Sequence, residues 1–161
     1  MFYAILKTVH LLSIIVWIGG MTFAHFFLRP AVASLEAPER VRLMHVALGR
    51  FFNAVLVAGV LAIGSGLWMM GRIAKQTVQA GAQLSLPPEW MAMAVLGVVM
   101  LAIFGHTRFA LYPRLTRAVT AASWPAGDAA LASIRTWLMV NLVVGVVIVA
   151  VTLLGLGAAG L

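Results

Sequence analysis

Apolar residues gather into four long runs along the chain, and polar residues collect between them. The runs cover residues 5–28, 51–70, 90–107 and 136–156. Each approaches or exceeds the roughly 20 apolar residues that cross a bilayer as a helix. The pattern predicts an all-α integral membrane protein, a four-transmembrane-helix bundle that forms a single domain over residues 1–161.

The amino-acid composition also indicates an integral membrane protein. Hydrophobic residues make up 63% of the chain, charged residues only 9%, and the mean hydropathy is +1.07. Such a chain cannot present an ordinary soluble surface, and little length is left for a soluble catalytic module. The chain has no cysteine, which excludes disulfides, thiolate metal sites and thiol nucleophiles.

The basic residues predict the topology. Eight of them lie in the first and third links, against three at the N-terminal end and in the middle link. The positive-inside rule then places the two arginine-rich links in the cytoplasm of a bacterium and both termini outside its inner membrane. The same distribution explains the net charge of +7 without nucleic-acid binding. "AVAS", residues 31–34, resembles a signal-peptide cleavage site, but the preceding run is too long for a signal peptide, so we expect the first helix to be retained.

The links carry helix-start signals. Pro38 suits the first turn of a helix that continues into the second span. Asp128 is expected to cap the N-terminus of the fourth. His45 lies in an arginine-rich amphipathic stretch, and we expect it to be solvated.

Small and amide residues inside the spans predict helix packing. Ala58, Ala62 and Gly66 recur at four-residue spacing, which lets a neighbouring backbone approach closely. Asn53 and Asn141 are expected to form hydrogen bonds across helices.

The two halves of the chain share a weak sequence repeat. The first span ends in His25 followed by Arg29-Pro30, and the third in His106 followed by Tyr112-Pro113. The pattern indicates a duplicated helical hairpin.

The polar residues of the spans limit the possible chemistry. No Asp or Glu lies near a span centre, which disfavours hydrolytic triads and paired-carboxylate catalysis. Imidazole, thioether, indole and guanidinium groups remain. That set suits haem or copper.

One face of the first span is the main candidate. At 100° per residue, His10, Trp17 and Met21 fall within about 40° of one another. His25 is rotated by about 60° from His10 and lies about 22 Å further along the helix.

Two cofactor hypotheses follow and stay open. Haem b takes one or two His or Met axial ligands: His25 pairs with His106 at the inner side, or His10 pairs with an outer methionine. Alternatively, His10 and the outer methionines hold Cu(I), a soft ion. The candidate methionines are Met69, Met70, Met91 and Met93.

Other residues are candidates around such a site. Trp17 would form a wall of the pocket. Arg50, Arg108 and Arg135 lie near the inner mouth, where a guanidinium can bind haem propionates, lipid phosphate or an acidic substrate.

The motif "KTVHLLSIIVWIGGMTF", followed by "RFF…SG" in the second span, resembles the copper-resistance protein D (CopD) family. The broader group includes the HemJ-type protoporphyrinogen oxidases. CopD resemblance implies copper handling at the inner membrane beside a periplasmic copper protein. HemJ resemblance implies haem b and porphyrinogen oxidation. Either resemblance implies a functional role for His10 and, more loosely, for Lys7 and Trp17. The Leu-Pro-Arg-Leu run expected of HemJ after the first helix is only approximated by "FFLRPAV", which disfavours porphyrinogen oxidation.

The sequence therefore predicts an inner-membrane redox protein that binds haem b on His10 and exchanges electrons with a quinone or a periplasmic partner. The alternative is a CopD-like copper-transport or copper-resistance protein that uses His10 and the outer methionines. A third hypothesis is a cofactor-free scaffold subunit, and an oligomer is compatible with each.

Overall fold

The computed structural model describes the backbone of residues 1–81 and 88–158, and the side chains of residues 1–81 and 90–154. Within these ranges the chain forms helices and no strand. The elements are α1 (Phe2–Phe23), the π-helix η1 (Ala24–Leu28), α2 (Arg29–Ala31), α3 (Ala37–Gln79), α4 (Pro88–His106), the π-helix η2 (Thr107–Leu111), α5 (Tyr112–Thr120) and α6 (Trp124–Ala158).

Four of the described helical segments are long and apolar enough to cross a membrane. They cover Phe2–Ala31, Ala37–Gln79, Trp90–Thr120 and Trp124–Leu154. Large apolar side chains, among them Ile15, Leu67 and Val98, face outward, as expected for contact with lipid. The predicted all-α four-helix membrane bundle is confirmed, although the helices extend beyond the apolar runs because their polar ends continue the same hydrogen bonding.

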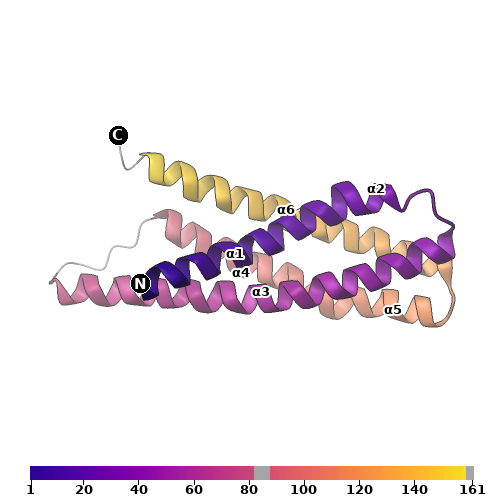
Figure 1. The fold of residues 1–161 in the computed structure, drawn as a ribbon, viewed down its shortest axis with the longest axis horizontal. Coiled ribbons are helices and arrows are strands. Elements are labelled where there is room, and N and C mark those ends of the chain that lie inside the picture. The colour runs from indigo at the N-terminus through magenta and orange to yellow at the C-terminus, as the bar shows by residue number, and fades with distance from the viewer. Residues whose placement is uncertain (82–87, 159–161) are drawn as a thin grey trace.

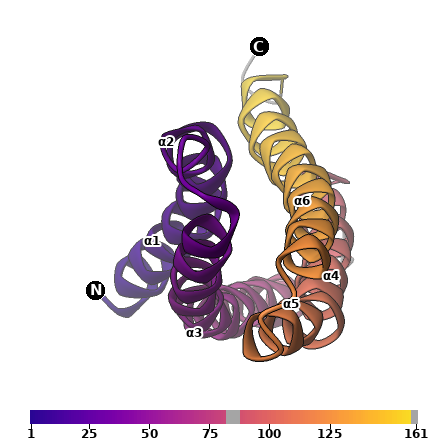
Figure 2. The same ribbon diagram turned by 90° about the vertical axis from the view of Figure 1, so that its right-hand side faces the viewer.

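The bundle consists of two hairpins. α1 packs along α3, and α4 with α5 packs along α6. Figure 1 shows the N-terminus and the last described turns of α6 toward one end of the molecule, which we call the terminal end. The helices α2 and α5 and two short links lie at the other end, the α2–α5 end. Figure 2 looks from that end and shows α1 and α2 on one side, with α4, α5 and α6 on the other.

Each hairpin contains a π-helix two residues before a proline. The Arg29 N–H bonds to the Ala24 carbonyl before Pro30, and the Tyr112 N–H bonds to the Thr107 carbonyl before Pro113. Proline has no N–H, and its ring clashes with the carbonyl four residues earlier. A widened turn accommodates this locally. The repeated π-helix before a proline supports the duplicated hairpin. It aligns His25 with Arg108, whereas the sequence interpretation aligned His25 with His106.

The helix starts differ in part from expectation. α3 begins at Ala37, beside Pro38, and runs unbroken into the second span, as predicted. α6 begins at Trp124, and the Gly127 N–H bonds to the Ser123 carbonyl. The prediction that Asp128 is an N-cap is therefore wrong. It lies inside the first turns of α6 and forms an ion pair.

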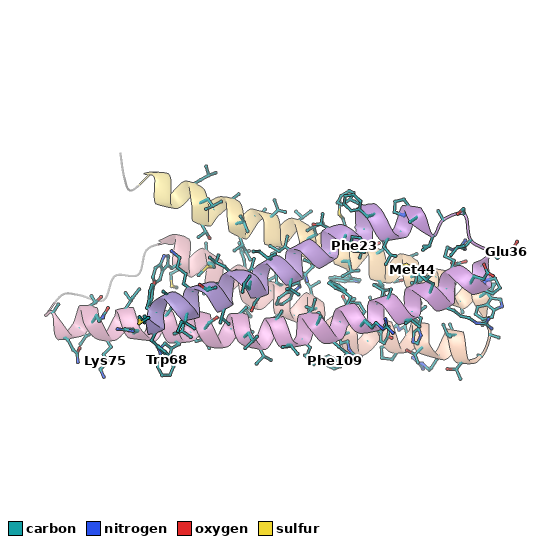
Figure 3. All side chains as sticks on the ribbon, viewed as in Figure 1. Phe23, Glu36, Met44, Trp68, Lys75 and Phe109 are labelled. Carbon is teal, nitrogen blue, oxygen red and sulfur yellow. The ribbon has the colours of Figure 1, made fainter. Side chains whose placement is uncertain are left out.

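The core lies where the two hairpins meet. Figure 3 shows the described side chains on the helices. Phe52, Val55 and Leu115 are fully buried in the core. Trp17 of α1 meets Phe104 of α4 edge to face, with ring centroids 5.6 Å apart. This aromatic contact joins the first hairpin to the second.

Candidate functional site

His10 is bonded across the α1–α3 interface. Its Nδ1 lies 2.9 Å from the carbonyl oxygen of Ala62 and 3.1 Å from Oγ of Ser65. A carbonyl oxygen only accepts hydrogen bonds, so the proton sits on Nδ1. In the neutral imidazole the other ring nitrogen, Nε2, then carries the lone pair. This is the usual state of a histidine that ligates a metal through Nε2.

Gly66 lets the imidazole lie against α3. A Cβ atom at this position would come within 3.3 Å of Cε1 of His10. Ala62 and Ala58, one and two turns earlier on α3, are buried. The three residues of the predicted small-residue stripe thus share one face of α3, and His10 of α1 contacts this face at Ala62 and Gly66.

Trp17 and Met21 continue the His10 face into the core. Their side chains are 7% and 1% exposed. Cζ3 of Trp17 would lie 3.2 Å from a Cβ at Gly59, so the indole packs directly on the α3 backbone. The predicted inward face of α1 is confirmed, while its cofactor role stays a prediction.

The candidate methionines are distributed unevenly around this site. Met69 and Met70 follow Gly66 by three and four residues, which places them on the same side of α3 one turn further along. Both are half-buried. On α4, Met93 is half-buried and Met91 is half exposed.

His25 and His106 lie in different surroundings. His25 lines a cavity of about 490 Å³ together with residues of α2, α3 and α6, and His106 does not line it. His106 is exposed and packs against Trp137, with ring centroids 5.0 Å apart. A haem held by both histidines stays a prediction that these contacts do not favour.

Arg108 belongs to a polar cluster that sequence reasoning missed in part. Its Nη2 donates to Oδ1 of Asn53 at 3.4 Å, and its guanidinium lies 5.3 Å from the Tyr112 ring centroid. The predicted cross-helix bond of Asn53 is confirmed. The Nε of Arg108 is buried without a partner in the described part of the chain.

His45 is the least expected member of this cluster. The prediction that it is solvated is wrong: its ring is half-buried and stacks on Tyr112, with centroids 5.2 Å apart and planes 6° apart. Its Nε2 lies 3.0 Å from Oγ1 of Thr116, and the Tyr112 hydroxyl donates to its backbone carbonyl. The "YPRLT" run carried the signal, since Tyr112 and Thr116 are one turn apart on a helix face.

Asn141 also differs from expectation. It is 2% exposed, and its Oδ1 finds no hydrogen-bond partner among the described residues. Arg50, another candidate, is exposed.

The described residues contain no group of three or more His, Cys, Asp or Glu that could hold a metal ion. A site at His10 would therefore draw on thioethers or on fewer protein ligands. Imidazole and thioether together suit Cu(I), because both are acceptable to a soft ion.

Comparison with known proteins identifies the family. The profile of the CopD family, copper resistance protein D, matches residues 45–154. The chain belongs to the CopD family. No curated protein and no solved structure matches the chain. The CopD match covers most of α3 and all of α4 and α5, and it begins after His10. It therefore supports copper resistance as the general function and leaves the role of His10 to the geometry.

Proposed function

We propose that this CopD-family protein binds Cu(I) within the membrane and passes it on, with Nε2 of His10 as the principal ligand. The observation that carries the proposal is the hydrogen bond from Nδ1 of His10 to the Ala62 carbonyl. It orients the ring and leaves the lone pair on Nε2. Removing such an outer partner typically weakens metal binding by about 10–100-fold.

The thioethers of Met69 and Met70 are the proposed co-ligands. They follow Gly66 by three and four residues, one helical turn beyond the point where His10 contacts α3. Met91 and Met93 on α4 are the further candidate ligands, for a second Cu(I) ion or for the ion as it is passed on. Thioethers are soft donors, so they suit Cu(I), and as neutral groups they are themselves inexpensive to bury in a bilayer.

The proposed topology gives the site a direction. With the arginine-rich links in the cytoplasm, His10 lies in the outer leaflet. Copper would then be exchanged with a periplasmic copper protein at the terminal end.

Haem b is the second candidate, because the same Nε2 lone pair can serve as an axial ligand. In that case the protein would transfer electrons to a quinone or a periplasmic redox partner. His25, His106, Arg50 and Arg108 would be the further haem-binding candidates.

The test is metal content and absorption of the protein purified in detergent. Wild-type protein is titrated with Cu(I) against a chromophoric chelator, beside His10→Gln and a matched His45→Gln control. We expect Cu(I) binding that His10→Gln lowers by at least about tenfold and that His45→Gln leaves unchanged. A Soret band with sharp bands on reduction supports haem and contradicts copper. Full Cu(I) affinity in His10→Gln contradicts the site.

A further inference from the structure

The cavity that His25 lines lies at the α2–α5 end of the bundle, far from His10. Its walls come from η1, α2, and the first turns of α3 and α6. Figure 2 shows α2 and α6, which both contribute residues to the lining, on opposite sides of the molecule. Its volume of about 490 Å³ falls in the range of small-molecule sites.

Three arginines line the cavity, and only one has an acidic partner. Arg40 bonds to both carboxylate oxygens of Asp128, at 3.1 and 2.8 Å. This is the one ion pair among the described side chains. Arg29 and Arg135 line the same cavity, and neither has a carboxylate partner among the described side chains. Their two positive charges are thus uncompensated.

The charge is placed on two different helical segments. Arg29 opens α2, directly after the π-helix, and Arg135 is half-buried on α6. His25, at the second position of the π-helix, adds a ring nitrogen that can donate a hydrogen bond. His25 of η1, Arg29 of α2 and Arg135 of α6 therefore line the same cavity.

The remaining wall is apolar. Met44, Leu48, Ile134 and Leu138 line the cavity and are buried. Leu48 and Leu138 are the lining residues furthest from the starts of α3 and α6. The cavity thus combines cationic side chains with an apolar wall, and on α6 the cationic Arg135 lies between the apolar Ile134 and Leu138.

We propose that this cavity binds a phosphoryl anion between Arg29 and Arg135. Guanidinium groups form paired, charge-assisted hydrogen bonds with phosphate oxygens. The apolar wall favours a phosphate carried on a lipid, whose glycerol and acyl chains would cover Leu48 and Leu138. The site is separate from the proposed copper site and does not depend on it.

The test compares two sources of the same chemistry. Purified protein in neutral detergent receives phosphatidylglycerol, phosphatidylcholine or inorganic phosphate, and retained ligand is measured by native mass spectrometry and by equilibrium dialysis. The test variant is Arg29→Gln/Arg135→Gln. The matched control is Arg114→Gln/Arg117→Gln, which removes two exposed charges from α5 at the same end, outside the cavity lining.

We expect phosphatidylglycerol to be retained in preference to phosphatidylcholine, and the test variant to lower its retention by about tenfold or more. The control variant keeps wild-type retention. Binding of inorganic phosphate with the same variant pattern also supports the site and identifies a free anion as the occupant. Retention of neither ligand, or equal losses in both double variants, overturns the proposal.

Discussion

Arg40 of α3 and Asp128 of α6 form an ion pair that joins the two hairpins at the α2–α5 end. Nη2 of Arg40 lies 3.1 Å from Oδ1 and 2.8 Å from Oδ2 of the carboxylate. Nη1 of the same guanidinium donates to the Leu35 carbonyl at 3.2 Å. One side chain thus connects α6 with the link that precedes α3.

The first prediction concerns the strength of this pair. The side chains are 29% and 40% exposed, so solvent screens the attraction. We expect a coupling free energy of about 1 kcal/mol in a double-mutant cycle of Arg40→Gln and Asp128→Asn. The measurement is the free energy of unfolding by SDS in mixed micelles. Additive single substitutions would show that the pair contributes nothing.

The second prediction concerns the glycine beneath His10. Gly66→Ala places a methyl group 3.3 Å from Cε1 of the imidazole, so the ring must shift by a few tenths of an ångström, which disturbs its bond to the Ala62 carbonyl. We expect Cu(I) affinity to fall by about tenfold, as for loss of an outer-shell bond.

Gly64→Ala is the matched control, since a Cβ at Gly64 meets nothing within 4 Å. It should leave Cu(I) affinity unchanged. Equal affinities in both variants would show that the ring position does not govern binding.

The third prediction concerns the turn between α5 and α6. Ala122 has a φ of 49°, and the Ser123 N–H bonds to the Ala118 carbonyl while the Ala122 N–H bonds to that of Val119. These bonds form a Schellman motif, whose left-handed position normally holds glycine.

Ala122→Gly should therefore stabilise the protein by up to about 1 kcal/mol, because it removes the left-handed penalty of an L-residue. Ala121→Gly, at the preceding position with a φ of −83°, is the control and should not stabilise. The readout is the free energy of unfolding in the same micelles. A loss of stability in Ala122→Gly would contradict the prediction.

The fourth prediction concerns the buried amide of α6. Because Oδ1 of Asn141 lacks a partner in the described structure, it carries a desolvation cost with no compensating bond. We expect Asn141→Leu to raise the free energy of unfolding by about 1 kcal/mol. Destabilisation in Asn141→Leu would contradict the prediction.

Much of the fold follows from local pattern. The four apolar runs predicted the spans because a bilayer leaves the backbone no partners except its own. Helical periodicity then placed His10, Trp17 and Met21 on one face, and the spacing of Ala58, Ala62 and Gly66 marked the contact surface of α3. These features depend on neighbours one or two turns away, so the sequence alone contains them.

Contacts between distant segments required the tertiary structure. Asp128 looked like a helix cap and is an ion-pair partner of Arg40, because α6 begins four residues earlier. His45 looked solvated and stacks on Tyr112, because α5 folds back against α3. The sequence by itself determined that the protein lies in a membrane, which segments form its helices and which helix faces point inward. Only the tertiary structure decided which polar groups meet, because those meetings depend on how helices far apart in the chain are rotated and aligned.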